Sequence, residues 1–263
     1  MRNKLVAANW KMHFTVAEAC ATAESLIRHV ERKPNVDVVI CPPYTALSKL
    51  HDLLKGTGIA LGAQNVFWME KGAFTGCVAP AMLVDLGVTY CIVGHSETRG
   101  RFGKLEIPES TLSLFSETDE TVNLKIRALL YHNIAPILCV GETLSEREAG
   151  KTDEVIRRQL RAGLQGIDAA ELHGFAVAYE PVWAIGTGQT CDTPEANRVC
   201  GMVRSELAAM LGDELASKTR VLYGGSVKAA NAKDLFGQSD IDGGLVGGAS
   251  LDPQEFSRII MSA

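Results

Sequence analysis

The feature that most constrains the fold is a strict alternation of short apolar runs and helical patterns along the whole chain. Eight apolar runs, rich in Val, Ile, Leu and Ala, each precede a stretch with the apolar spacing of a helix. The predicted strands cover residues 4–8, 36–41, 60–63, 90–93, 135–140, 175–178, 220–223 and 243–246. Strict alternation favours a parallel sheet with crossover helices, and eight repeats favour its closure. We therefore predict an α/β protein, an eight-stranded parallel (β/α)8 barrel.

The length and composition fit one domain of this kind. The chain has 263 residues, of which 46% are hydrophobic and 22% charged, and such a barrel takes about 250 residues. No linker rich in Pro, Ser or charge divides it, so we predict a single domain over residues 1–263. The net charge of −5 and the lack of a basic stripe disfavour nucleic acid as a partner. No apolar span of membrane length occurs, which argues against a membrane protein.

The cysteines and the N-terminus bear on the cellular compartment. Seven cysteines are scattered along the chain without the spacing of a metal site, so we predict reduced and mostly buried thiols. The N-terminus runs directly into the first strand without a signal-peptide pattern. We expect a cytoplasmic protein.

The stretch that follows the sixth strand carries the first candidate for chemistry. Glu180 lies where the strand ends, and Pro181 stops ladder pairing immediately afterwards. Val182 and Trp183 give the following loop an apolar flap, and its glycines let the backbone move. This arrangement predicts a carboxylate base that a mobile loop closes off from water. Beyond the loop, Thr193 is the expected N-cap of the next helix.

Other candidates also come directly after predicted strands. Asn9 and Lys11 follow the first strand, and His95 follows the fourth. In a barrel, these positions converge at one end, where such enzymes place their active sites. There, Lys11 becomes a ligand for an anion, and the start of a helical turn at His95 would keep its imidazole neutral. The alternatives are a solvated surface lysine and a structural histidine.

Glycine pairs after the last two strands suggest a phosphate site. Gly224-Gly225 and Gly247-Gly248 offer backbone N–H groups, Ser226 a hydroxyl, and Gly186 a further N–H on closure of the loop. The alternative is that these glycines form ordinary tight turns. We find no dinucleotide fingerprint and no metal-ligand cluster, so we predict neither a cofactor nor a metal. The set suits proton abstraction beside the carbonyl of a small phosphorylated substrate.

The same residues lie in blocks that resemble the triosephosphate isomerase family, a standard example of a carboxylate base, a neutral histidine and a closing loop. The blocks include residues 8–12 (ANWKM), 63–65 (AQN), 93–97 (VGHSE), 179–188 (YEPVWAIGTG), 223–227 (YGGSV) and 245–250 (LVGGAS). The resemblance implies interconversion of dihydroxyacetone phosphate and D-glyceraldehyde 3-phosphate through an enediolate, a reaction of glycolysis and gluconeogenesis.

The resemblance also implies a role for each site residue. Glu180 would move the proton between carbons, while a neutral His95 would polarise the carbonyl and move protons between the oxygens. Lys11 would stabilise negative charge, and Asn9 would help to place the substrate oxygens. The phosphate would be held by Gly186, Ser226, Gly247 and Gly248.

The family is usually a homodimer, and here the apolar loop 65–78 would dock into the partner near its active site. The chain departs from its relatives in an apparent insertion, residues 103–115, after the fourth strand. It also has Thr98 and Cys77 where relatives usually carry an arginine and a glutamate that pair across the interface. Since both charges are lost together, we expect the insertion to take over interface contacts and to pack near the active site or the interface.

Two other functions remain open. Another phosphate-binding barrel, such as a sugar-phosphate aldolase or synthase, would need a Schiff-base lysine on a strand, and we find none at the end of strand six. An inactive paralogue that serves as a scaffold would not need Asn9, Lys11, His95 and Glu180, all of which are present.

Overall fold

A computed structural model describes residues 2–31 and 33–263, and these form an eight-stranded barrel. The strands are β1 (Lys4–Asn9), β2 (Val36–Cys41), β3 (Ile59–Ala63), β4 (Tyr90–Val93), β5 (Ala135–Val140), β6 (Ala176–Tyr179), β7 (Arg220–Tyr223) and β8 (Gly243–Val246). Neighbouring strands are parallel, and β1 pairs with both β2 and β8, which closes the sheet. The predicted fold class is confirmed.

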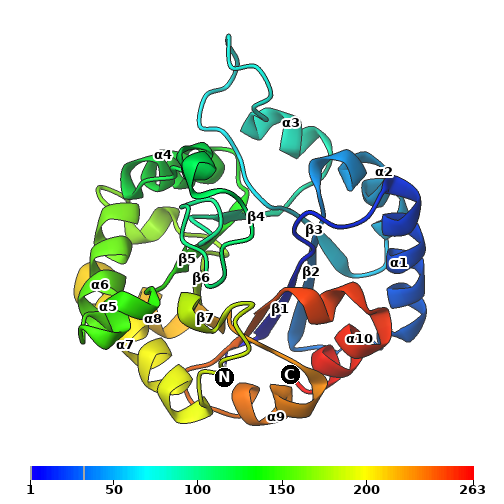
Figure 1. The fold of residues 1–263 in the computed structure, drawn as a ribbon. Helices are drawn as coiled ribbons and strands as arrows, with labels where there is room; N and C mark the ends of the chain where they lie inside the picture. Colours follow the sequence, from blue (N-terminus) through cyan, green and yellow to red (C-terminus); the bar gives the residue numbers. More distant parts are fainter. Residues whose placement is uncertain (1, 32) are drawn as a thin grey trace.

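Helices surround the strands in a ring (Figure 1). They are α1 (Val16–His29), α2 (Tyr44–Leu54), α3 (Pro80–Asp85), α4 (Asp119–Tyr131), α5 (Leu144–Glu148), α6 (Thr152–Gly163), α7 (Thr193–Leu211), α8 (Asp213–Lys218), α9 (Ala229–Phe236) and α10 (Pro253–Met261). None of the helices in the described part of the chain has the length and apolar character to cross a membrane.

Local sequence explains where the helices begin. Thr15 caps α1, and Glu18 reaches back to the Thr15 backbone N–H, which completes a capping box. The prediction that Thr193 caps α7 is wrong by one residue. The Asp192 carboxylate accepts the Glu195 N–H at 2.8 Å, and Thr193 is already helical. A carboxylate at this position also interacts favourably with the positive end of the helix dipole.

The core has two layers because successive residues of a strand point to opposite faces of the sheet. One set of side chains fills the barrel interior and includes Leu5, Val39, Ile92 and Leu222. A larger set packs between the sheet and the helices. Both faces of the strands are therefore apolar, as expected for a parallel sheet covered on its outer side by helices.

The cysteines agree with the prediction of reduced thiols. All seven are free, and five of them are buried. Cys139 lies in the barrel interior, where burial raises the pKa of its thiol well above the ordinary value. It is therefore a protonated core side chain at neutral pH. Cys77 is exposed.

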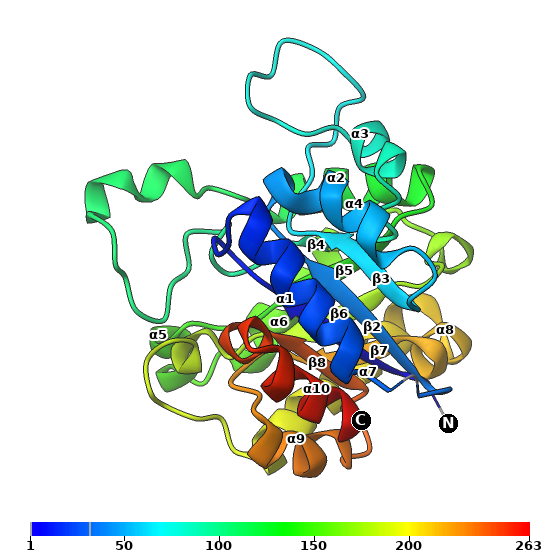
Figure 2. The ribbon, with the colours of Figure 1, turned by 90° about the vertical axis from the view of Figure 1, so that its right-hand side faces the viewer.

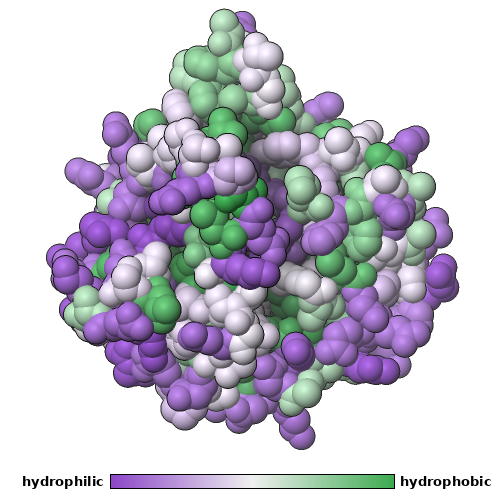
Figure 3. Space-filling model, viewed as in Figure 1, coloured by the Kyte–Doolittle hydropathy of each residue, from purple (hydrophilic) through white to green (hydrophobic). Residues whose placement is uncertain are grey.

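Two segments project from the barrel (Figure 2). Loop 65–78 is stiffened by its own aromatic residues, with Phe67 4.1 Å from Trp68 and 4.7 Å from Phe74 between ring centroids. Met69 and Phe74 are nevertheless 43% and 41% exposed, and the projection is largely apolar on its surface (Figure 3).

The second projection is the predicted insertion, residues 103–115. It contains a short 3-10 helix, η1 (Glu109–Leu114), and no residue of the insertion is buried. The Phe102 and Phe115 rings pack edge to face with 5.6 Å between their centroids, and this contact holds the two ends of the insertion together. The segment rises from the end of the barrel where the strands finish rather than packing into the body of the domain (Figure 2).

Candidate active site

All eight residues predicted from the sequence line one pocket of about 610 Å³. The pocket opens at the carboxyl ends of the strands, which we call the mouth of the barrel. The residues are Asn9, Lys11, His95, Glu180, Gly186, Ser226, Gly247 and Gly248. Asn9 is the last residue of β1, and the others come from the segments after β1, β4, β6, β7 and β8, so closure of the barrel brings them together.

The Glu180 carboxylate is held at the wall of this pocket and is only 2% exposed. The Ser96 backbone N–H donates to Oε2 at 3.0 Å, and His95 Nε2 lies 2.9 Å from Oε1. Burial raises the pKa of Glu180, but His95 and the Ser96 N–H more than offset this, and the net pKa is lowered. The carboxylate is therefore ionised at neutral pH and available as a base.

The hydrogen bonds around His95 define its tautomer. The Glu97 backbone N–H donates to Nδ1 at 3.1 Å, so Nδ1 accepts and the ring proton lies on Nε2, facing Glu180. Burial lowers the pKa of His95, whereas the adjacent Glu180 carboxylate raises it, and the net pKa is raised in this arrangement. The Glu97 carboxylate adds to this rise and the Lys11 ammonium opposes it, and the neutral ring expected from the sequence stays a prediction.

Lys11 is held in an unusual backbone conformation. Its φ of +50° lies in the left-handed region, which a lysine seldom adopts. Asn9 Oδ1 accepts the Lys11 N–H at 3.0 Å, and Gln64 Nε2 donates to the Lys11 carbonyl at 2.8 Å. The ammonium pairs with Glu97 at 2.6 Å. Together these contacts hold the Lys11 backbone in this conformation and keep its ammonium at the pocket wall.

Two glycines of the pocket lie so close to neighbouring residues that a side chain at either position would collide with them. A Cβ at Gly225 would lie 2.3 Å from Tyr223 Oη, and one at Gly224 would lie 3.0 Å from the Tyr179 carbonyl oxygen. Gly248 differs, because a Cβ there would meet none of the described atoms within 4 Å. The backbone at Gly248 therefore lies open to the pocket, where its N–H could reach an anion.

Residues 179–188, which we call the lid, are fixed at their base. Trp183 Nε1 donates to Glu142 Oε1 at 2.9 Å, and the Tyr179 hydroxyl donates to the same oxygen at 3.2 Å. The Arg147 guanidinium lies 4.3 Å from the Trp183 ring centroid. Farther along, Gly186 and Gly188 are exposed and have φ of +70° and +81°. The lid thus combines an anchored base with a glycine-rich half that can move.

Sequence reasoning missed three residues of the site: Ser96, Glu97 and Glu142. Ser96 holds Glu180, Glu97 pairs with Lys11, and Glu142 anchors the lid. A signal was present, because all three follow β4 or β5 within four residues of the strand end, as the predicted site residues follow theirs.

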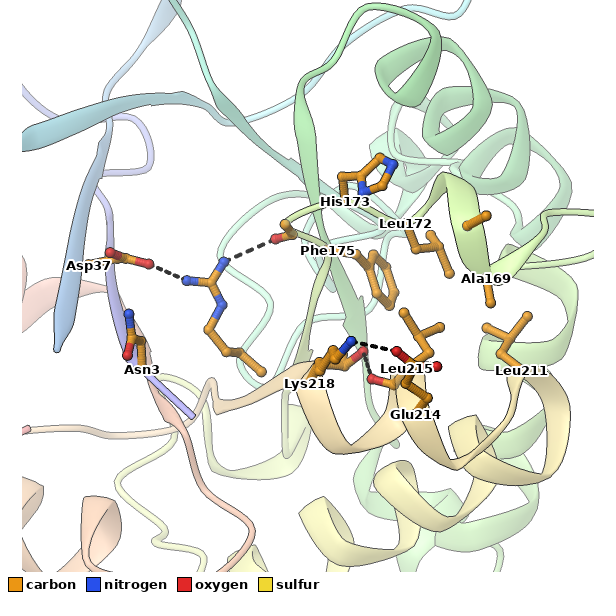
Figure 4. A pocket seen from close by; sticks show the side chains of 14 residues that line it. Asn3, Asp37, Ala169, Leu172, His173, Phe175, Leu211, Glu214, Leu215 and Lys218 are labelled. Carbon is orange, nitrogen blue, oxygen red and sulfur yellow. Dashed lines mark hydrogen bonds and ion pairs between the residues drawn. The ribbon is translucent and has the colours of Figure 1, made fainter. Parts of the chain in front are cut away.

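A second cavity, of about 710 Å³, lies at the opposite end of the barrel, beside the starts of β1, β2 and β7 (Figure 4). Its charged side chains pair with one another, Arg220 with Asp37 and Lys218 with Glu214. Leu172 and Phe175 form part of an apolar wall. This cavity does not contain the paired base and histidine found at the mouth. Within residues 2–31 and 33–263, no group of three or more His, Cys, Asp or Glu is placed to hold a metal ion.

Comparison with known proteins gives one consistent result. A sequence model described as Triosephosphate isomerase matches residues 4–263. The chain is 48% identical over 263 residues to a triosephosphate isomerase of Symbiobacterium thermophilum, and the alignment covers 100% of this chain and 98% of the relative. It is 45% identical over 260 residues to the protein of the same name from Clostridium tetani, covering 99% of this chain and 96% of that one. Along essentially its whole length, this chain belongs to the triosephosphate isomerase family.

Proposed function

We propose that four side chains at the mouth of the barrel, Glu180, His95, Lys11 and Asn9, carry out the reaction of the family. That reaction is the interconversion of dihydroxyacetone phosphate and D-glyceraldehyde 3-phosphate by proton transfer through an enediolate. The observation that supports it best is the contact between an ionised buried carboxylate and an imidazole 2.9 Å away, in the pocket that also holds a cation and the glycine loops.

Glu180 acts as the base. Its carboxylate takes the proton from the carbon beside the substrate carbonyl, the electron pair moves into the carbonyl, and an enediolate results. The protonated carboxyl then returns the proton to the neighbouring carbon. Because Ser96 and His95 hold the carboxylate in the present arrangement, it must leave them to reach substrate.

His95 and Lys11 act on the substrate oxygens. The Nε2 proton of His95 is donated to the oxygen that gains charge, and it passes between the two oxygens as the carbonyl changes place. The Lys11 ammonium stabilises the negative charge of the enediolate, and the Asn9 side chain helps to place the oxygens. Asn9 is 5% exposed and fixed through the Lys11 N–H, so it is preorganised.

The phosphate is held by Gly186, Ser226, Gly247 and Gly248. These residues all line the pocket that also contains Glu180 and His95. Backbone N–H groups there bind the dianion without a mobile side chain. When the lid closes, Gly186 adds its N–H, and water is excluded, which discourages loss of phosphate from the enediolate.

A coupled assay on D-glyceraldehyde 3-phosphate tests this assignment. Glu180→Gln keeps the size of the side chain but removes the base, and we expect a loss of kcat of about 10²-fold or more. Glu154→Gln on the exposed surface of α6 is a matched control and should retain activity. Turnover that survives Glu180→Gln would overturn the assignment, and an inactive native chain would favour the scaffold. Cleavage or condensation of the substrate would favour an aldolase or synthase.

We further propose a single domain, residues 1–263, with 103–115 as an insertion, and a homodimer formed through loop 65–78. A groove of about 480 Å³ supports the dimer, since it lies between the root of this loop and the end of the insertion. Val66, Phe67, Val78, Leu114 and Phe115 line it. Leu114 is 79% exposed, so a second copy would remove substantial apolar surface from water.

Deletion of 103–115 tests whether the insertion contributes to that interface. We expect a lower mass in solution at micromolar concentration, or a dimer that dissociates more readily. An equally stable dimer would show that the insertion lies outside the interface. A cytoplasmic location and a place in glycolysis and gluconeogenesis complete the proposal, and cell fractionation tests the location.

A further inference from the structure

The base Glu180 lies between two loops that come from different strands. On one side, the Ser96 N–H in the loop after β4 holds its carboxylate at 3.0 Å. On the other side, its carbonyl packs against Gly141 in the loop after β5, so closely that a Cβ at Gly141 would lie 1.7 Å from the oxygen. Glu180 therefore contacts one loop through its carboxylate and the other through its backbone.

Arg101 joins the two loops. Its backbone N–H donates at 2.9 Å to the carbonyl of Ser96, the residue whose own N–H holds Glu180. Its guanidinium crosses to the other loop, where Nη2 donates to the Gly141 carbonyl at 3.1 Å and pairs with Glu146. One side chain thus spans positions that are 40 residues apart in sequence and lie on either side of the base.

The far end of this bridge is itself fixed. The Glu146 carboxylate accepts the Thr143 N–H at 2.8 Å and its hydroxyl at 3.0 Å. Burial raises the pKa of Glu146, but the Thr143 hydrogen bonds and the Arg101 charge outweigh it and lower the pKa. The carboxylate therefore stays ionised over the physiological range, and the pair with Arg101 persists.

The burial of the Arg101 side chain is unfavourable for folding, which is unexpected if the residue serves stability alone. Its side chain is only 19% exposed, and within the described part of the chain its Nε is buried without a hydrogen-bond partner. A buried donor left unpaired destabilises the folded protein. The geometry explains the cost, because a planar guanidinium can reach a carbonyl and a carboxylate together, which the point charge of a lysine cannot do equally well.

We propose that Arg101 is a positioning residue for Glu180, which fixes the separation of Ser96 and Gly141 and with it the path of the carboxylate. The proposal depends on Glu180 being the base, as proposed above. Arg101 does not touch the carboxylate and acts through the two loops.

Arg101→Gln tests the proposal through a split between kcat and KM. We expect kcat to fall about tenfold, because small misplacement of a reacting group has large effects on rate. KM should stay within about twofold of the native value, since the phosphate loops are untouched. Loosening of the Ser96 N–H contact should raise the pKa of Glu180, so the acidic limb of kcat/KM should move to higher pH. Arg101→Lys should recover part of the rate.

The matched control is Arg161→Gln, which removes an arginine–glutamate contact between α6 and α7, away from the mouth. It should leave kcat and the pH profile unchanged. Arg101→Gln with native kcat and an unmoved acidic limb would overturn the proposal, as would a rise in KM alone. If Arg101→Gln does not fold, Glu146→Gln provides the test, because it releases the guanidinium from one anchor. If the acidic limb of kcat/KM does not move in Glu146→Gln, the proposal is overturned as well. Whether Glu180 is the base is tested separately by Glu180→Gln.

Discussion

The indole N–H of Trp183 and the buried carboxylate of Glu142 form a 2.9 Å hydrogen bond that ties the lid to the loop after β5. Burial raises the pKa of Glu142, although the Trp183 and Tyr179 hydrogen bonds oppose this effect. Among the described residues, no partner is found for the second oxygen, Oε2. The carboxylate therefore depends heavily on the two donors that the lid and its base supply.

Trp183→Phe should therefore destabilise the protein. It removes the indole donor, and a hydrogen bond to a charged group is worth about 1.5–3 kcal/mol. Chemical denaturation measures the loss. A double-mutant cycle with Glu142→Gln separates the shared contact from the effect of lost packing, and the two changes should be non-additive. Strict additivity would mean that the bond does not contribute.

The pair formed by His95 and Glu180 should make stability depend on pH in a defined window. The pKa of Glu180 is lowered from 4.5, so its contribution is present above that value and is lost as pH falls through the folded pKa. The pKa of His95 is raised from 6.5, so its contribution is present below 6.5 and is lost as pH rises through the folded pKa. The pair should stabilise most between about pH 4.5 and 6.5.

Urea denaturation of the native protein and of Glu180→Gln across pH 4 to 9 measures this effect. The difference in unfolding free energy should be largest near pH 5 to 6 and should shrink towards pH 9. Glu154→Gln on the surface of α6 should give a small and flat difference. A difference that grows steadily with pH would contradict the pairing.

The sequence was sufficient for the fold and for the residues at strand ends, and the reason is topological. Asn9, His95 and Glu180 could be grouped because closure of a parallel barrel brings the carboxyl ends of all strands together. Strand position singles out Ser96 as well, although it does not reveal its contact with Glu180. Arg101 could not be assigned in this way, because its role depends on a contact with a residue 40 positions along the chain, and neither hydrophobic period nor strand position encodes such a contact.

Helix ends were the least predictable part of the fold. Asp192 and Thr193 are both good N-cap residues, and only the backbone geometry shows that Asp192 serves. Helices α5 and α6 are separate because the chain breaks at Gly150, whose φ of +69° ends the first of them. Helix α8 was not predicted at all, because it follows α7 after the single residue Gly212.

Gly103, the first residue of the insertion, lies against the backbone of the lid, and its substitution should lower kcat. A Cβ there would lie 2.3 Å from the Ile185 carbonyl oxygen and 2.4 Å from that of Val182. Both are backbone atoms of the lid, so Gly103→Ala must displace either the lid or the root of the insertion. We expect kcat to fall about tenfold because the lid closes less accurately. The coupled assay measures it.

Gly201→Ala is the control for that experiment. It adds the same methyl group in α7, where the nearest atom would lie at an ordinary 3.4 Å. It should leave kcat unchanged and can stabilise the helix slightly. Equal kcat values for Gly103→Ala and the native protein would show that the lid can shift to accommodate the methyl group without loss of activity.

The apolar tip of loop 65–78 provides the test of the homodimer. Phe74 is 41% exposed although it packs on Phe67, and burial of a large apolar side chain contributes about 1.5–3 kcal/mol. If a second copy covers this tip, Phe74→Asp places a charge in the interface, and the mass in solution should fall towards that of one chain. Met261→Asp is the matched control, because Met261 is 42% exposed on α10, the last helix of the ring. Sedimentation equilibrium at several concentrations distinguishes the two variants, and a dimer that persists in Phe74→Asp would exclude the loop as the main contact.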